Sequence, residues 1–252
     1  MHGLIPSYVI LSLPLGYLVS YLSESRSYIK YPAIVILGFF ILLNLFQTWQ
    51  YSRRIIDPQT MTEKYYWSVF GKVKVHFRDM MKLEDFHPDP DLFLKDSTAF
   101  NKKQGSFYDF EDPNADYQAK LEKEIVKNGR MSLKLDVEKA YSPAFEKKYG
   151  EITKCPVIGV RLTAWVWSKD PFTSNLTSLI ITQAHKSQLY NYRYLSLEKL
   201  NLKPGVWNQV VLNYFTTVDP DPEDKVIAYV YYRGNTEIYI DDVKTEIFEP
   251  RN

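Results

Sequence analysis

"EIYIDDVKTEIF" (residues 237–248) is a strand-like run that carries two adjacent carboxylates, Asp241 and Asp242, in its middle. Side chains alternate between the two faces of an extended chain, so Ile240 and Val243 would fall on opposite faces. The apolar register therefore shifts by one residue at the acidic pair. A β-bulge there, with one extra residue against the neighbouring strand, would return both apolar sets to one buried face. The stretch predicts a bulged strand with a re-aimed carboxylate.

Runs with similar alternation continue through the chain from Gly105 onward and predict an all-β domain. Apolar and polar residues alternate in "RMSLKLDVE" and in "VIGVRLTAWVW". The other strand-like runs are "SFYDFED", "TSLIITQAH", "LYNYRYLSL", "VWNQVVLNYF" and "DKVIAYVYY". About eight strands separated by Pro, Gly, Asn and Asp are typical of an antiparallel β-sandwich. Because strands lie at both ends of residues 105–252, we predict that the sandwich closes as a jelly roll.

Two stretches near the N-terminus, residues 4–22 and 31–51, contain no charged residue. Each has about 20 residues, which is the length of a transmembrane helix. The first stretch lacks the basic start and the A-x-A-like site of a cleaved signal peptide, and the second follows closely. Residues 1–56 are therefore predicted to form a transmembrane helical hairpin that anchors the chain in a lipid bilayer.

Asn44 and Gln47 are polar side chains within the second predicted span. Such side chains suit contacts with other transmembrane helices better than contacts with lipid. We therefore expect helix partners, and expect the chain to be the tail of a longer polytopic protein or to pair with one; a simple two-helix anchor is the alternative. The positive charges flanking the spans are nearly balanced and lean slightly toward a cytoplasmic C-terminal domain.

Residues 57–104 are predicted to form an aromatic amphipathic helix followed by a connector. Thr60 or Thr62 can cap a short helix that ends at Gly71. The aromatic residues of this helix are Tyr65, Tyr66, Trp67 and Phe70. Such rings favour the lipid headgroup region, although they could equally pack on the β domain.

Composition excludes several classes of function. A net charge of +1 gives no reason to expect a nucleic-acid partner. A single cysteine, Cys155, excludes an intramolecular disulfide, and the four histidines lack the spacing of zinc ligands. The sequence contains no convincing catalytic triad, phosphate loop or facing carboxylate pair outside the predicted bulge. We expect no active site within these residues.

The order of several landmarks resembles the galactose-binding-like jelly rolls used as carbohydrate-binding modules, common in Bacteroidetes, over residues 105–249. The landmarks are "FYDFED", "NGRMSLKLD", "VIGVRLTAWVWSKDP", "YRYLSLEKLNLKPGVWNQVVLNYF" and "DKVIAYVYYRGNTEIYIDDVKTEIF". Residues 40–70 resemble the final helix and exit segment of polytopic bacterial membrane proteins similar to glycosyltransferases that use lipid-linked sugars. This second resemblance implies an extracytoplasmic, periplasmic β domain, in conflict with the charge count.

The resemblance to these modules also implies a structural calcium ion. Asp109 or Glu111 on the first strand would meet Asp241 or Asp242 on the last, with a backbone carbonyl from the loop near Asn128 and Gly129. Carboxylate and carbonyl oxygens are the ligands that calcium prefers. Alternatively, these carboxylates cap turns or pair with basic side chains.

Exposed aromatic rings flanked by polar groups could stack on a sugar ring. Tyr190, Tyr192 and Tyr194 would share one strand face. The residues predicted to bind sugar are Arg161, Trp165, Trp167 and Tyr192. Structural packing of the same rings is the alternative.

Together these features predict an integral membrane protein with a non-catalytic, carbohydrate-binding jelly-roll module, or one accessory to the synthesis of envelope glycan or glycolipid. Two alternatives remain. The β domain could bind protein within a membrane complex, or the chain could be the C-terminal fragment of a membrane glycosyltransferase whose active site lies upstream.

Overall fold

The computed structural model describes residues 16–17, 20–21, 27–57, 59–84, 89, 91, 95, 97–112, 121–172 and 176–251. Most of the first predicted span, residues 4–22, lies outside the described residues. By its internal contacts the chain divides into two units, residues 1–85 and 86–252, which are considered separately.

The first unit contains a long apolar helix, α2 (Ser27–Ser52), which covers the second predicted span. Its segment Tyr28–Ser52 has 25 residues and a mean hydropathy of 2.0, and its most apolar part has no buried residue within the structure. Among the described residues it is the one helix that is long and apolar enough to cross a membrane. Its length and composition would allow it to span the hydrocarbon core of a bilayer.

Two short helices, α3 (Glu63–Val69) and α4 (Phe77–Met80), follow α2. Thr62 is the N-cap of α3, because its hydroxyl accepts a hydrogen bond from the backbone N–H of Tyr65 at 3.0 Å. The chain leaves α3 through Gly71, whose φ of +76° is accessible to glycine without strain. This confirms the predicted short helix and selects Thr62 as its cap.

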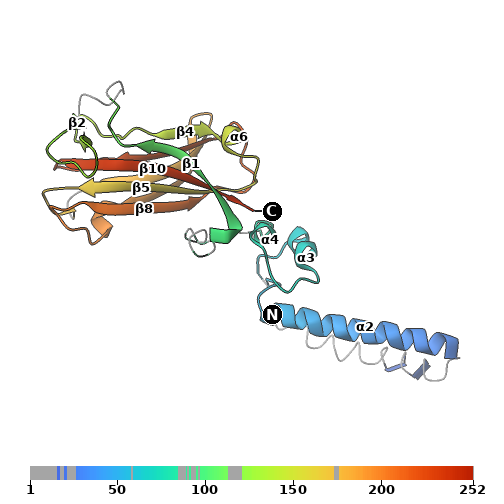
Figure 1. The fold of residues 1–252 in the computed structure, drawn as a ribbon. Coiled ribbons are helices and arrows are strands. Elements are labelled where there is room, and N and C mark those ends of the chain that lie inside the picture. Colours follow the sequence, from blue (N-terminus) through green and yellow to red (C-terminus); the bar gives the residue numbers. More distant parts are fainter. Residues whose placement is uncertain are drawn as a thin grey trace. The chain divides into compact units, whose positions relative to one another are not determined.

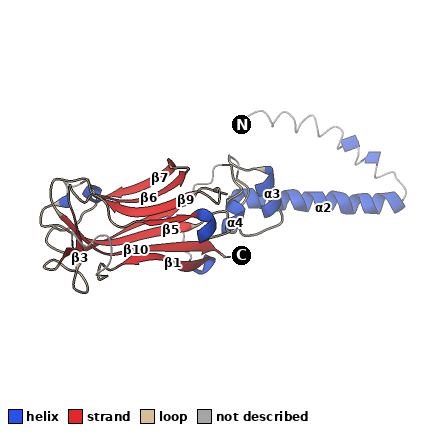
Figure 2. Ribbon diagram, turned by 90° about the horizontal axis from the view of Figure 1, so that it is seen from above, coloured by secondary structure: helices blue, strands red, loops and turns tan. Residues whose placement is uncertain are grey.

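The second unit is a sandwich of two antiparallel sheets, as predicted (Figures 1 and 2). The six-stranded sheet has the order β2-β3-β10-β5-β8, with β1 also paired to β10, and the four-stranded sheet has the order β4-β9-β6-β7. The strands of the six-stranded sheet are β1 (Phe100–Tyr108), β2 (Leu121–Glu122), β3 (Ser132–Leu135), β5 (Gly159–Trp167), β8 (Asn208–Phe215) and β10 (Ile238–Pro250). Those of the four-stranded sheet are β4 (Phe145–Lys148), β6 (Ser178–His185), β7 (Gln188–Ser196) and β9 (Lys225–Tyr231). The short helical turns are η1 (Ser97–Ala99), α6 (Tyr149–Ile152) and η4 (Leu197–Lys199).

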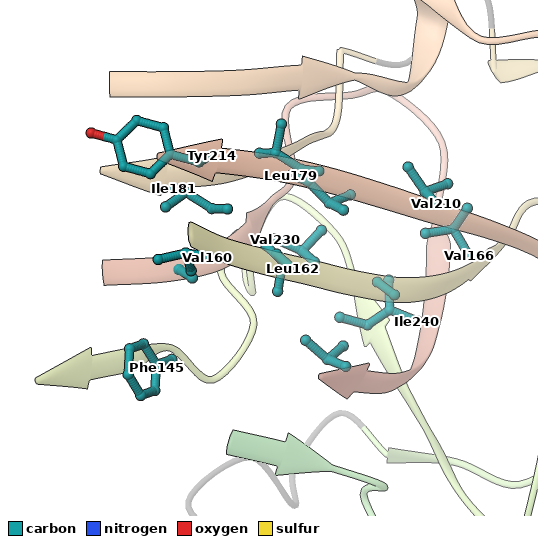
Figure 3. Packing of buried hydrophobic residues seen from close by; sticks show 14 of the residues in the cluster. Phe145, Val160, Leu162, Val166, Leu179, Ile181, Val210, Tyr214, Val230 and Ile240 are labelled. Carbon is teal, nitrogen blue, oxygen red and sulfur yellow. The ribbon is translucent and has the colours of Figure 1, made fainter. Parts of the chain in front are cut away.

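Alternate side chains of both sheets meet in one apolar core (Figure 3). Leu162 and Val166 of β5 face this core, as do Leu179 of β6 and Val230 of β9. Each of these four side chains is fully buried. Because the inward positions are apolar on both sheets, the two outer faces are left to carry the polar and aromatic residues.

The bulge predicted in β10 is present. Asp241 pairs with Trp165 of β5 and Lys244 pairs with Thr163, so β10 holds one residue more than β5 between the two pairs. Asp242 lies in this bulge with φ of +48°. The apolar residues before and after it, Ile238, Ile240, Val243 and Ile247, all join the same core. The extra residue therefore corrects the register as the sequence indicated.

The first strand differs from the prediction. It begins at Phe100 and ends at Tyr108, so Asp109 and Glu111 follow the strand instead of lying on it. Phe110 has φ of +61° and is fully buried, and this left-handed residue turns the chain at the end of β1. The short strands β2 and β4 were also not predicted, because β2 has only two residues and "FEKK" in β4 has a single apolar residue, so neither shows alternation.

Candidate functional site

Tyrosines cover the outer face of the four-stranded sheet. In β7, Tyr192 and Tyr194 lie two positions apart and so share one face of the strand. In β9, Tyr229 and Tyr231 share the face opposite to the buried Ala228 and Val230. Ile180 of β6 pairs with Tyr194 on one side and with Tyr229 on the other. The tyrosines of two separate strands are thus brought to one surface by the strand between them.

The rings on this face contact one another and remain open to solvent. Tyr192 and Tyr194 are 49% and 52% exposed, and their ring centroids lie 5.7 Å apart. Tyr141 pairs with β9 through an isolated bridge, and its ring stacks on Tyr231 with centroids 4.9 Å apart. Partial burial raises the pKa of Tyr192 and of Tyr229. We call Tyr141, Tyr192, Tyr194, Tyr229 and Tyr231 the tyrosine face.

A hollow of about 270 Å³ lies at one end of the tyrosine face. Tyr192, Tyr194 and Tyr231 line it together with the polar or charged side chains Ser178, Ser196, Glu198, Lys199 and Arg233. The ammonium of Lys199 lies 5.9 Å from the centroid of the Tyr194 ring. The hydroxyl of Ser196 is buried and forms no hydrogen bond with the described residues. The hollow thus combines flat aromatic surface with hydrogen-bonding groups.

Three of the residues predicted to bind sugar lie on the outer face of the other sheet, and their side chains are engaged within the protein. Lys127 covers Trp165, with its ammonium 4.5 Å from the ring centroid. Trp167 packs edge-to-face on Tyr239, with ring centroids 5.5 Å apart. Arg161 Nε donates to Asn213 Oδ1 at 2.9 Å, and burial lowers the pKa of this guanidinium. These contacts match the alternative of structural packing.

Tyr192 is the one predicted sugar-binding residue that lines the hollow in the four-stranded sheet. The four predicted residues therefore do not form a single site: Arg161, Trp165 and Trp167 lie on one outer face of the sandwich and Tyr192 lies on the opposite one. Alternation correctly placed Arg161, Trp165 and Trp167 on one face of β5. It could not identify the sheet to which each strand belongs.

Tyr190 does not share a face with Tyr192 and Tyr194, contrary to the prediction. The pairing of β6 and β7 shifts register beside it, since Gln183 pairs with Asn191 and Ala184 with Leu189. The Tyr190 hydroxyl accepts from Gln183 Nε2 at 2.9 Å and donates to Asp224 Oδ2 at 2.7 Å. The bulge thus diverts this ring to a polar network with Gln183 and Asp224.

Three residues of the tyrosine face were not predicted as candidate binding residues: Tyr141, Tyr229 and Tyr231. A signal for two of them was present, because "KVIAYVYY" places Tyr229 and Tyr231 opposite the apolar Val226, Ala228 and Val230. For Tyr141, which lies in a single bridge, no local pattern existed.

The acidic residues predicted to bind calcium gather around the loop 127–131. Glu111 Oε1 accepts hydrogen bonds from the backbone N–H groups of Arg130 at 2.6 Å and Met131 at 2.9 Å, and these bonds lower its pKa. Asp241 Oδ2 accepts from the N–H groups of Lys127 at 3.0 Å and Asn128 at 3.2 Å. We call Glu111, Asp241, Asp242 and residues 127–131 the acidic clasp.

Burial dominates the electrostatics of Asp241, which has no exposed surface, and raises its pKa. Asn128 Nδ2 donates to Asp242 Oδ2, which ties the bulge to the same loop. Asp109 Oδ1 accepts from the N–H of Glu111 at 3.2 Å and so caps the turn after β1. The clasp brings together Glu111, Asp241 and Asp242, and leaves Asp109 in a local turn.

Backbone N–H groups already occupy one oxygen of Glu111 and both oxygens of Asp241. A cation would have to use the remaining lone pairs, on the second Glu111 oxygen and on Asp242. Within the described residues, no group of three or more His, Cys, Asp or Glu side chains is arranged to hold a metal ion. The calcium ion stays a prediction.

No protein-family model and no curated protein matches this sequence. Solved structures with a similar arrangement include the CBM22-1–CBM22-2 tandem domain of Paenibacillus barcinonensis Xyn10C, with 13% identity and a TM-score of 0.40 over 57% of this chain and 48% of the tandem. The chain therefore spans about half of that structure's length. The CBM22-2 xylan-binding domain of the same protein matches with 13% identity and a TM-score of 0.36, over 58% of this chain and 99% of that domain. The C-terminal family 22 carbohydrate-binding module of Clostridium thermocellum Xyn10B matches with 13% identity and a TM-score of 0.32, over 50% of this chain and 77% of that module.

Proposed function

We propose that this chain is a membrane-anchored glycan-binding protein that binds carbohydrate at the hollow of the tyrosine face. The observation that carries the proposal is the combination of three tyrosine rings with five polar side chains around one hollow. A pyranose ring has a C–H surface that packs on an aromatic ring, while its hydroxyl groups need donors and acceptors at the rim.

The polar groups of the hollow suit a ligand rich in hydroxyls. Lys199 and Arg233 supply donors and Glu198 supplies an acceptor, and Ser196 offers a hydroxyl without a partner among the described residues. A buried polar group without a hydrogen bond is costly, and a ligand hydroxyl could relieve that cost. The half-exposed rings of Tyr192 and Tyr194 supply the stacking surface.

The apolar helix α2 would hold this binding face near a membrane. The resemblance of residues 40–70 to membrane proteins that use lipid-linked sugars supports an extracytoplasmic position for the β domain. In that position the module would recognise envelope glycan or assist its synthesis. The glycan would then be synthesised by a partner protein or by an upstream part of this protein, and the residues described would only bind it.

The proposal is tested by isothermal titration calorimetry of the full chain in detergent against soluble xylo-, cello-, manno- and galacto-oligosaccharides. We expect at least one of these to bind, and Tyr194→Ala or Tyr231→Ala to weaken its affinity about tenfold. Trp165→Ala, on the opposite sheet, serves as the matched control and should leave the affinity unchanged, with melting curves confirming that each variant folds. If Trp165→Ala alone lost binding, the site would lie on the six-stranded sheet and the proposal would be overturned. The absence of binding to every sugar would overturn it as well.

A further inference from the structure

The segment after α2 is fixed to the last turns of that helix by buried polar contacts. Gln50 is 1% exposed, and its Nε2 donates to the carbonyl oxygens of Val69 at 3.0 Å and Lys72 at 2.8 Å. The Tyr65 hydroxyl donates to the carbonyl of Ile55 at 2.7 Å. Ile55, Tyr65 and Val69 form the small apolar core of this unit. Residues 53–84, which we call the foot, thus keep a defined position at the end of α2.

The foot turns an apolar surface outward. Tyr65 and Val69 lie on the inner side of α3, whereas Trp67 is 63% exposed and Phe70 is 41% exposed. The ring centroids of Trp67 and Phe70 lie 5.6 Å apart. Val73, three residues after Phe70 in the sequence, is 64% exposed. Adjacent large apolar side chains left open to water mark a surface that contacts something else.

The charge of the foot indicates what it contacts. Residues 53–84 contain seven Lys or Arg and four Asp or Glu, a surplus of three positive charges. A segment with a positive net charge and with exposed Trp and Phe suits the headgroup region of an anionic bilayer, where aromatic rings are favoured and basic residues are attracted. The foot is also continuous with α2, whose apolar surface ends where the foot begins.

We infer that the foot binds the interface of an anionic lipid bilayer, with Trp67, Phe70 and Val73 inserted among the headgroups. This contact would fix the depth and tilt of α2, because a rigid aromatic element at the end of a span resists sliding of the helix through the membrane. The inference concerns lipid and does not depend on sugar binding by the tyrosine face.

The test uses the full chain with Cys155→Ser, reconstituted in phosphatidylcholine vesicles with or without phosphatidylglycerol. A fluorophore is attached at Trp67→Cys or, as the matched reference, at Ile41→Cys in the middle of α2, and lipids carrying a spin label at a shallow or a deep position are used as quenchers. We expect the shallow lipid to quench the label at residue 67 more strongly, with an increase when phosphatidylglycerol is present. The deep lipid should be the stronger quencher at residue 41.

Quenching at residue 41 without any at residue 67 would overturn the inference. If residue 67 were then also shielded from aqueous iodide, the surface would be covered by protein, either another chain or another part of this one. Absence of quenching at both positions would overturn it as well, because α2 itself would not lie in the bilayer.

Discussion

A Cβ atom placed on Gly129 would overlap the carboxylate of Glu111. Gly129 also has φ of +71°, a left-handed conformation that glycine adopts more readily than other residues. The absence of a side chain at this position allows the Glu111 carboxylate to reach the backbone N–H groups of Arg130 and Met131. The acidic clasp therefore depends on both a glycine and a carboxylate.

Gly129→Ala should destabilise the protein more than an ordinary substitution at a left-handed glycine. Gly205 provides the matched control, because its φ is +73° and no atom of the described residues lies within 4 Å of an added Cβ. Gly205→Ala should lower the free energy of unfolding by about 1 kcal/mol, which is the cost of holding a residue with a Cβ atom in the left-handed conformation. Gly129→Ala should cost more, since Glu111 must move as well. Equal losses in urea unfolding would show that the contact with Glu111 is unimportant.

Calcium should raise the melting temperature if the clasp binds it. A ligand that binds the folded state stabilises it more as its affinity and concentration rise, and the carboxylate oxygens of Glu111 and Asp242 that keep lone pairs are of the type calcium prefers. Calcium chloride should shift the melting temperature of the wild-type chain, whereas Glu111→Gln and Asp242→Asn should show no shift. If the wild-type protein does not respond, the clasp is held by hydrogen bonds alone.

Tyr190→Phe should make folding more sensitive to acid. Burial alone would raise the pKa of Asp224, but hydrogen bonds from Tyr190 and His185 lower it below its ordinary value. The stability that this carboxylate contributes is therefore present above the pKa of unfolded Asp and is lost as pH falls through the folded pKa. Without the Tyr190 hydroxyl the folded pKa rises, so that contribution is smaller and is lost at a higher pH.

Melting temperatures measured from neutral to acidic pH check this prediction. Tyr190→Phe should cost about 1–3 kcal/mol near neutral pH, because a nearly buried carboxylate loses a donor. Tyr192→Phe is the control, since Tyr192 is half exposed. Indistinguishable pH curves for the two variants would show that the Tyr190 hydroxyl does not stabilise Asp224.

The features that the sequence predicted correctly depend on local alternation. The one-residue shift between Ile240 and Val243 was enough to predict the bulge, because a strand has a fixed period of two. The β-sandwich could be predicted for the same reason. Gln47, by contrast, was expected to contact another transmembrane helix, but its amide donates to the Tyr66 hydroxyl at 2.6 Å.

The candidate site was only partly predictable, because it depends on which strands become neighbours. Tyr194 and Tyr229 are 35 positions apart in the sequence and meet only because β6 lies between β7 and β9. Alternation within one strand carries no information about that order. The register shift that moves Tyr190 to the other face likewise arises from the pairing of β6 with β7, and no residue type in β7 predicts it.

Stacking and hydrogen bonding by Tyr194 can be separated. No hydrogen bond of its hydroxyl to a described residue is seen, and its ring is 52% exposed at the hollow, so we expect the ring to carry its share of sugar binding. Tyr194→Phe should keep the affinity for the best-bound oligosaccharide within about threefold, whereas Tyr194→Leu should lower it about tenfold. Calorimetric dissociation constants measure both effects, and Tyr190→Phe should leave the constant unchanged because that hydroxyl bonds to Asp224. If Phe weakened binding as much as Leu, the hydroxyl would be the binding group, and the tyrosine face would act by hydrogen bonds instead of stacking.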